Sequence, residues 1–261
     1  MNYSSLTYAV RDKIITITLN RPDRRNALDD VMIRELTDAF TAAGKGNGTR
    51  VVVITGAGKA FCAGMDLDYL QRFAKLTHEE NLQDARNFMK LLQTISTLKK
   101  PVIAAVNGPA LGGGCGLAAA CDFVFAARSA ARIGAPEIRL GFLPAVILIF
   151  LIKRMGEGRA KEFVLRGDVL DAVVAQQRGL VTELVADDTL LDTVTTFGAE
   201  LARTTSGSSI MLTKELFARL DEMTLRDSLE YAANLNALAR KTEDFRKGIE
   251  SFLNKEKLEW N

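Results

Sequence analysis

The stretch from Lys100 to Pro144 constrains the fold more than any other part of the sequence. It begins with the apolar, β-branched run Val102 to Val106, which predicts a buried strand. Three consecutive glycines follow at 112–114, and the residues at 117–120 are leucine and alanine, which form helices readily. The stretch therefore predicts a strand, a glycine-rich turn and the start of a helix, in that order.

A helix start that follows glycines favours an anion or a developing oxyanion. The first N–H groups of a helix have no partner within it, and the positive end of the helix dipole lies behind them. Glycine lets an oxygen approach this backbone closely. The spacing excludes a dinucleotide-binding fingerprint, because Leu117 stands three residues after Gly114, and neither Gly-Lys pair (44–45, 58–59) continues as a phosphate-binding loop. The alternative is that the glycines only let the helix pack against a strand.

Length and composition narrow the class of protein. A chain of 261 residues with 48% hydrophobic residues predicts a packed globular fold. The net charge of +2 is too balanced for nucleic acid as the main partner. Three cysteines without metal-ligand spacing fit reduced thiols and predict no metal site. With no secretory h-region and no apolar run near the ~20 residues that span a bilayer, we expect a cytoplasmic protein without a membrane partner.

The order of the elements indicates an α/β core followed by helices. The alternation in 14–19 predicts a half-buried strand, Asp29 is a candidate N-cap for the next helix, and 51–54 predicts a buried strand before a second glycine-rich loop. Residues 70–99 predict one helix, in which His78, the only histidine, lies in a solvated patch. We expect a core over 1–204 and a helical region over 205–261.

Six segments along the chain carry recognisable motifs: NRPDRRNAL (20–28), FCAGMDL (61–67), KPVIAAVNGPALGGG (100–114), ACDFVFAA (120–127), PEIRLGFLP (136–144) and GDVLDAVVAQQRGLVTELV (167–185). In this order they resemble signatures of the enoyl-CoA hydratase/isomerase (crotonase) family. The resemblance implies a spiral of repeated ββα units with a C-terminal helical region that assembles trimers, often paired as hexamers. It implies an acyl-CoA thioester as the partner, with coenzyme A present as part of the substrate and no permanently bound cofactor.

The resemblance also implies the site residues. Backbone N–H groups at Met65 and Gly113 match the pair that binds the thioester oxygen, and Glu137 matches an acid/base. Donors placed at such an oxygen stabilise the negative charge that develops on it. The loops at 24–28 and 60–68 match those that hold coenzyme A. The implied coenzyme contacts are Arg25, Ala27, Leu28, Ala60, Ala63, Met65, Asp66, Leu67, Asp68 and Gly113.

The chain departs from the family pattern at two places. Hydratases of the family usually carry a glutamate where this sequence has Gly116, so one carboxylate, Glu137, has to do the proton chemistry. Hydration is favoured, while double-bond isomerisation and a non-catalytic acyl-CoA binder stay open. Provided the site has room, we expect glutamate at 116 to raise hydration by adding a second carboxylate. The apolar segment 145–156 replaces a glycine-rich one and loosely resembles enzymes of methylglutaconyl-CoA; it is either core or part of an acyl pocket.

Other candidate residues have two interpretations each. Cys62 and Cys115 flank the glycine-rich turns, but cysteine often serves as a small buried apolar residue. Asp66 and Asp68 either contact the coenzyme or cap the loop. Lys255 and Lys257 either approach the coenzyme phosphates or lie on a solvated face.

Overall fold

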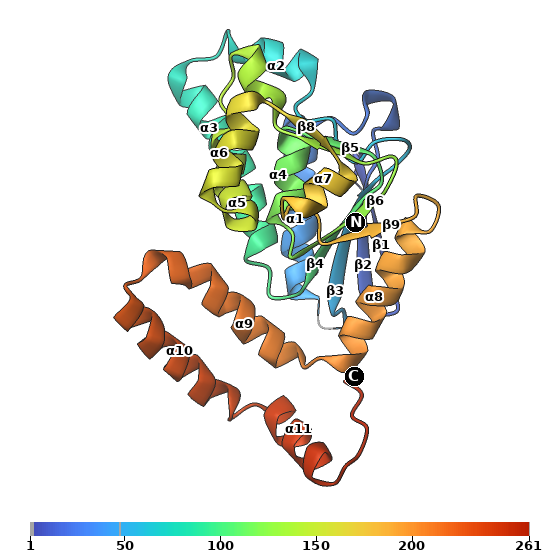
Figure 1. The fold of residues 1–261 in the computed structure, drawn as a ribbon, viewed down its shortest axis with the longest axis vertical. Coiled ribbons are helices and arrows are strands. Elements are labelled where there is room, and N and C mark those ends of the chain that lie inside the picture. Colours follow the sequence, from blue (N-terminus) through green and yellow to red (C-terminus); the bar gives the residue numbers. More distant parts are fainter. Residues whose placement is uncertain (1–2, 47, 261) are drawn as a thin grey trace.

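The computed structural model describes residues 3–46 and 48–260, and its centre is a six-stranded sheet (Figure 1). The order is β1-β2-β3-β4-β6-β9, in which β1 is antiparallel to β2 and every other neighbouring pair is parallel. Every residue of β3 and of β4 is buried, as expected for parallel strands covered on both faces. The strands are β1 (Leu6–Arg11), β2 (Ile14–Leu19), β3 (Val51–Gly56), β4 (Val102–Val106), β6 (Phe123–Ala127) and β9 (Glu183–Val185).

A second, three-stranded sheet lies beside the first. Its order is β5-β7-β8, with β5 parallel to β7 and β7 antiparallel to β8. The strands are β5 (Pro109–Leu111), β7 (Arg132–Gly134) and β8 (Val169–Asp171). Because β5 follows β4 directly, the second sheet begins where the central strand of the first one ends.

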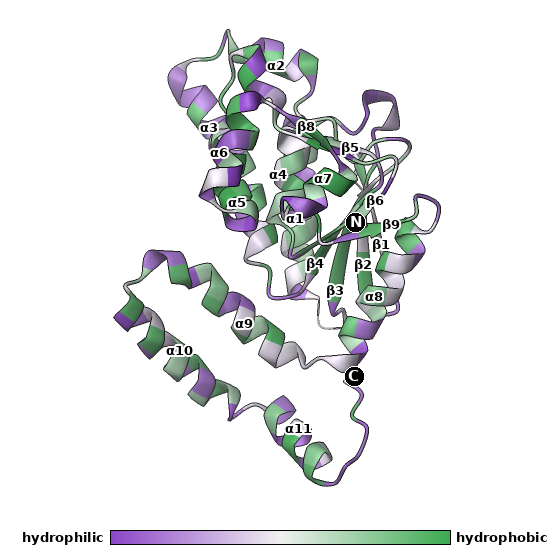
Figure 2. Ribbon diagram, viewed as in Figure 1, coloured by the Kyte–Doolittle hydropathy of each residue, from purple (hydrophilic) through white to green (hydrophobic). Residues whose placement is uncertain are grey.

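Helices cover both faces of the large sheet. Helix α8 (Leu190–Thr204) lies so close to one face that a Cβ on Gly198 would be 3.3 Å from Ile14 and 3.4 Å from Val51. The remaining helices of the core are α1 (Asp30–Lys45), α2 (Leu67–Phe73), α3 (His78–Ser96), α4 (Gly113–Ala120), α5 (Ala145–Met155), α6 (Glu157–Arg166) and α7 (Ala172–Gln177). Among them α4 packs against α3 and α5 and is buried at all eight positions. In Figure 2 the strands and α4 are mostly coloured as hydrophobic, which marks the core.

The single helix predicted over 70–99 is wrong, because α2 and α3 are separate helices. The helical conformation is interrupted at 74–77, and Thr77, the N-cap of α3, forms a capping box with Glu80. Its backbone N–H donates to Glu80 Oε2 at 2.7 Å, and its hydroxyl accepts from the Glu80 N–H at 3.3 Å. His78 is exposed at the first position of α3, as predicted.

The C-terminal residues form an arm that extends away from the sheets (Figure 1). We call the segment 205–255 the arm; its elements are α9 (Gly207–Arg219), η3 (Leu220–Glu222), α10 (Leu225–Ala239) and α11 (Glu243–Leu253). Helix α10 has no buried residue. Polar contacts attach the arm to the core: Lys214 donates to Asp122 and to the Lys100 carbonyl. In the described part of the chain, no helix has the length and apolar character needed to cross a membrane.

Candidate active site

The two glycine-rich turns lie side by side, one after β3 and the other after β5. The Cys62 N–H donates to the Pro109 carbonyl at 3.0 Å, and the Leu111 N–H donates to the Cys62 carbonyl at 2.9 Å. A Cβ on Gly114 would lie 2.2 Å from the Cys62 carbonyl oxygen, so no larger residue fits there. The close-packing role is therefore real for Gly114, and also for Gly113, where a Cβ would lie 2.9 Å from Leu28 Cδ1. Packing against the core does not account for Gly112, where a Cβ would meet the Glu137 carboxyl.

Two backbone N–H groups of these turns remain without an acceptor. Leu28 donates to the Gly64 carbonyl at 2.8 Å and accepts from the Asp66 N–H at 2.8 Å. Because a trans peptide is planar, the Met65 N–H points opposite to the Gly64 carbonyl, and therefore away from Leu28. The Gly113 N–H belongs to the first turn of α4. Within the described residues, neither N–H donates a hydrogen bond.

Gly112 brings a carboxyl group to the start of α4. It is the N-cap of the helix, with φ of +51°, and its N–H donates to the Gly134 carbonyl at 2.8 Å. A Cβ at this position would lie 3.1 Å from Glu137 Oε1. Both the positive φ and this close approach favour glycine. The Glu137 carboxyl therefore lies against the N-terminus of α4, where the first N–H groups of the helix are.

Glu137 is held in a short 3₁₀ helix, η2 (Pro136–Leu140), after β7. Proline begins this helix and Gly141, with φ of +72°, ends it. The Phe142 N–H donates to the Glu137 carbonyl at 3.0 Å, and the Ala135 N–H donates to the Asp168 carbonyl at 3.2 Å. These bonds fix the backbone on both sides of the carboxyl group, so its position is set by the second sheet.

The Glu137 carboxyl is suited to taking up and releasing a proton. Its Oε2 is buried and has no hydrogen-bond partner among the described residues. Burial raises the pKa of this carboxyl above its ordinary value, and a hydrogen bond with its own backbone N–H opposes the shift in part. A half-buried carboxyl with a free oxygen and a raised pKa is typical of a general acid or base.

The room that a glutamate at 116 would need is already filled. A Cβ on Gly116 would lie 2.3 Å from Ile147 Cγ2 and 3.4 Å from Leu92 Cδ1. The expectation that glutamate at 116 raises hydration therefore lacks the space it required. On α5, Ile147 and Leu151 are buried while Ile149 is exposed, so this segment is core on one face only.

The residues expected at the coenzyme differ in what they can offer. Arg25, Leu67 and Asp68 are exposed, and the Leu67 side chain is 71% exposed. Ala27, Leu28 and Ala60 are buried, and both backbone groups of Leu28 are already hydrogen-bonded within the protein. Ala63 donates its N–H to the Arg25 carbonyl at 3.0 Å. Asp66 caps α2 by accepting from the Asp68 N–H at 3.0 Å. Its capping interpretation is confirmed.

Two residues hold the turns together, a role that the sequence did not reveal, although it marked Asn26 as part of a loop. Asn26 is fully buried, with φ of +55°, and its amide donates to the carbonyls of Ala57 and Ala60 at 2.9 and 2.8 Å. Its Oδ1 accepts from the Arg21 N–H at 2.9 Å. The Arg21 guanidinium contacts Asp29 and Asp66. Both residues belong to the NRPDRRNAL segment, which was the one available signal.

The cysteines are not poised as nucleophiles. All three thiols are buried. Burial raises the pKa of Cys62 and of Cys121 to about 12. Burial also raises the pKa of Cys115, and the charge of Glu137 adds to the effect. A thiol with so high a pKa forms little thiolate near neutral pH, so the interpretation as small buried residues holds.

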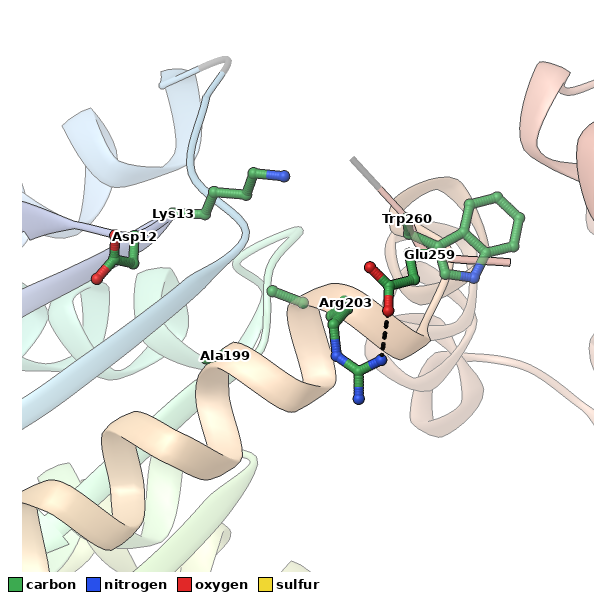
Figure 3. Close-up of a pocket in the computed structure, with 7 residues that line it drawn as sticks. Asp12, Lys13, Ala199, Arg203, Glu259 and Trp260 are labelled. Atoms are coloured by element: carbon green, nitrogen blue, oxygen red, sulfur yellow. Dashed lines mark hydrogen bonds and ion pairs between the residues drawn. The ribbon is translucent and has the colours of Figure 1, made fainter. Parts of the chain in front are cut away.

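Two hollows of the surface are lined by other residues. One, of about 250 Å³, lies between the β1–β2 turn, α8 and the C-terminal Glu259 and Trp260 (Figure 3). The other, of about 560 Å³, lies between α1 and α3. Neither is lined by Met65, Gly113 or Glu137, and charged residues contribute to both. The candidate site is therefore where the two turns and η2 meet.

Comparison with known proteins gives one family over almost the whole chain. The model of the enoyl-CoA hydratase/isomerase family matches residues 10–261. The 2,3-dehydroadipyl-CoA hydratase of Escherichia coli is 36% identical over 253 residues, covering 97% of this chain and 96% of that protein. The crotonyl-CoA hydratase of Syntrophomonas wolfei is 33% identical over 263 residues, covering 98% of each.

Solved structures agree with the family model. The enoyl-CoA hydratase of Mycobacterium smegmatis superposes with a TM-score of 0.91 at 29% identity, covering 98% of this chain and 99% of that one. The predicted crotonase fold, with its helical C-terminal region, is confirmed.

Proposed function

Because the chain belongs to the enoyl-CoA hydratase/isomerase family and is an enzyme of that family, we propose that it hydrates the α,β double bond of an enoyl-CoA thioester. In this proposal the thioester oxygen lies against the N–H groups of Met65 and Gly113, and Glu137 is the acid/base. The N–H groups that have no acceptor and the neighbouring carboxyl with a buried, unpartnered oxygen support this assignment.

The two N–H groups stabilise the intermediate. When water adds to the β-carbon, the electron pair of the double bond moves through the α-carbon onto the thioester oxygen and makes an enolate. Two fixed donors at that oxygen stabilise this charge more than the smaller charge of the substrate carbonyl. The dipole of α4, behind the Gly113 N–H, acts in the same direction. Each donor is worth roughly 10² to 10³ in rate.

Glu137 moves the proton in both halves of the reaction. As a carboxylate it takes one proton from the water whose oxygen bonds to the β-carbon. The carboxylic acid so formed then delivers that proton to the α-carbon as the enolate collapses to the thioester. The net change is addition of one water, and Glu137 ends as a carboxylate. The observation that carries this assignment is the 3.1 Å approach of Glu137 Oε1 to the would-be Cβ of Gly112 at the start of α4.

The acyl group we propose is branched, such as that of methylglutaconyl-CoA. The resemblance of Pro144 with the apolar segment 145–156, together with GGGCGL at 112–117, supports this. The apolar character of the residues after Glu137, where Phe142 and Leu143 are exposed, supports it as well. Related enzymes are named for different acyl groups, one dicarboxylic and one short and straight. The acyl group is therefore the part of the proposal that a substrate panel must decide.

A second candidate reaction is isomerisation of the double bond. Ile147 fills the space beside Gly116, so the site offers a single carboxylate. One carboxylate is sufficient to remove a proton from one carbon of the acyl chain and return it to another. The same two N–H groups would stabilise the dienolate formed between the two steps.

The coenzyme part of the substrate would lie along the loops at 24–28 and 60–68. Arg25 and Asp68 are exposed there, and Leu67 offers an apolar surface. Lys255 and Lys257 lie beyond the end of α11 and are exposed, so they remain candidates for the coenzyme phosphates.

We also propose that the chain assembles as a trimer, or as a multiple of it, through the arm. The arm exposes large apolar side chains that a monomer leaves in water. These are Phe217, Leu220, Leu225, Leu229, Leu238, Phe245, Ile249, Phe252 and Leu253. Light scattering at micromolar concentration tests this, and a monomer would contradict it.

The reaction is tested with a panel of straight and branched enoyl-CoAs in water labelled with oxygen-18 and deuterium. Mass spectrometry of the products separates the two reactions. Oxygen-18 at the β-carbon identifies hydration, and deuterium at carbon without oxygen-18 identifies isomerisation. Incorporation of neither label, together with no change in the position of the double bond in any enoyl-CoA, would contradict both.

A further inference from the structure

The Arg21 guanidinium meets three groups at the loop that faces Met65. Its Nη1 donates to the Ala27 carbonyl at 2.7 Å and pairs with Asp29 at 2.8 Å, while its Nη2 pairs with Asp66 Oδ2 at 3.1 Å. The Arg21 side chain is 22% exposed, and that of Asp66 only 6%. The arginine is therefore a largely buried cation rather than a solvated loop residue.

The partners of Arg21 form a continuous hydrogen-bonded line to Met65. The Ala27 carbonyl that accepts from Arg21 belongs to the same peptide unit as the Leu28 N–H. That N–H donates to the Gly64 carbonyl at 2.8 Å, and the Gly64 carbonyl belongs to the same peptide unit as the Met65 N–H. Because each peptide is planar and trans, both N–H groups point onward, away from the arginine. The line begins at a guanidinium and ends at a free N–H.

We propose that Arg21 is a positioning residue that orients and polarises the Met65 N–H through the peptide units 27–28 and 64–65. The inference rests on the proposed function, in which that N–H binds the thioester oxygen. Hydrogen bonds in a chain polarise one another, by about 10–30% per bond. A cation at the head of the line draws electron density toward itself and makes the terminal N–H a stronger donor.

The same arginine also fixes the position of the line. Asp29 caps α1 by accepting from the Met32 N–H at 2.8 Å, and Asp66 caps α2. Arg21 thus joins both helix starts to the peptide before Leu28. A shift of about 1 Å at a catalytic group can cost roughly 10²-fold in rate, so loss of this clamp acts on the chemical step.

The test compares the hydration kinetics of Arg21→Met and of the wild-type enzyme, with an enoyl-CoA that the wild-type enzyme hydrates as substrate. We expect kcat to fall about 10- to 100-fold, between the effect of a weakened donor and that of a lost one, while KM changes less than about threefold. Arg21→Lys keeps the charge without the planar fork and should recover part of the loss. Arg203→Gln is the matched control: Arg203, in the last turn of α8, pairs with Glu259 at 2.9 Å (Figure 3) and belongs to neither glycine-rich turn, so its loss should leave kcat unchanged.

A second measurement reports the donor directly. Butyryl-CoA labelled with carbon-13 at the thioester carbonyl has no double bond to hydrate, and its C=O stretching frequency falls when donors polarise the carbonyl. We expect the bound frequency in Arg21→Met to return part of the way toward the value in water. Removing Arg21 leaves the buried Asp66 without its cation, which can destabilise the fold. Arg21→Met/Asp66→Asn removes that charge and keeps a capping residue.

The outcomes separate the two proposals. If the folded double variant keeps both the frequency shift and the kcat of the wild-type enzyme, the role of Arg21 is overturned, while the Met65 and Gly113 assignment stands. A wild-type enzyme that binds butyryl-CoA without any frequency shift would overturn the Met65 and Gly113 assignment, and the role of Arg21 with it. A reduced shift and a reduced kcat in the double variant support the proposal.

Discussion

Gly112 and Gly116 stand one helical turn apart on α4, and they make room for opposite things. A Cβ on Gly112 would meet the Glu137 carboxyl at 3.1 Å, whereas a Cβ on Gly116 would meet the Ile147 side chain at 2.3 Å. Gly112 leaves room for a carboxyl group that can move a proton. Gly116 leaves room for an apolar side chain of the core. The same residue type in one short helix thus has a chemical role at one end and a structural role at the other.

The difference comes from the elements that pack against α4. Gly112 lies under η2, which presents a carboxyl group, and Gly116 lies under α5, which presents an isoleucine. The role of each glycine therefore depends on a residue much later in the sequence: Glu137, 25 positions after Gly112, and Ile147, 31 positions after Gly116. Substitutions at these two glycines and at their neighbours can break or sharpen the contrast.

The largest expected effect on kcat is that of replacing Glu137, whose carboxyl group faces Gly112. Glu137→Gln should lower kcat by about 10² to 10⁴-fold, because an amide of nearly the same shape cannot take up and release the proton. Binding of butyryl-CoA, measured by calorimetry, should change little. Retention of more than about a tenth of wild-type turnover would contradict the role of Glu137.

Gly112→Ala should come next, with a fall in kcat of roughly 10²-fold. The added methyl group displaces the Glu137 carboxyl, and the φ of +51° disfavours any residue with a side chain. Thermal unfolding should show a loss of about 1 kcal/mol or more. If the folded variant kept wild-type kcat, the contact between Gly112 and Glu137 would be irrelevant to the reaction.

At the packing end, Gly116→Glu should act on stability and give no gain in hydration. Overpacking against Ile147 alone costs about 1–3 kcal/mol. In Gly116→Glu/Ile147→Ala the clash is removed, and we expect the double variant to be more stable than the sum of its single variants predicts. Strict additivity in urea unfolding would mean that the two side chains do not compete for the same space.

The smallest effect concerns pH. Burial raises the pKa of Glu137, and the proposed reaction starts from its carboxylate, so kcat/KM should fall with acid at a pH above the ordinary glutamate value of 4.5. The folded state binds this proton more tightly than the unfolded state. The unfavourable charge is therefore present above the folded pKa and disappears as pH falls. Glu137→Gln should be more stable than wild type at neutral pH and equal to it in acid; a difference that persists at low pH would argue against this cause.

The sequence was most informative where local chemistry decides the structure. The β-branched runs at 14–19, 51–54 and 102–106 predicted three central strands, and Asp29 was recognised as a helix cap. The short strands β5, β7, β8 and β9 have three residues each and depend on partners far away in the sequence. A pattern within three residues is too short to reveal such pairing.

The site was predictable in part for the same reason. The glycine-rich turns and Glu137 could be found from their residues and their family resemblance, and the structure brings Glu137 to the start of α4. Arg21 and Ile147 could not, because an arginine in a loop looks the same whether it is solvated or buried. Likewise, an isoleucine in an apolar run does not show which neighbour it touches.

The return of the C-terminus has a mechanical consequence. The Trp260 N–H donates to the Arg203 carbonyl at 2.8 Å, its ring packs on Gly248, and Glu259 pairs with Arg203 near the end of α8. The arm is thus a strap fastened at both ends to one helix. A pull on the C-terminus would load α8, and through it the large sheet, before it stretched the arm. Without Glu259 and Trp260, the contacts of the described residues would hold the arm to the core only on the side of α9 and η3, through its start and the Lys214–Asp122 and Lys153–Asp221 pairs, and a pull on the C-terminus would no longer reach α8 first.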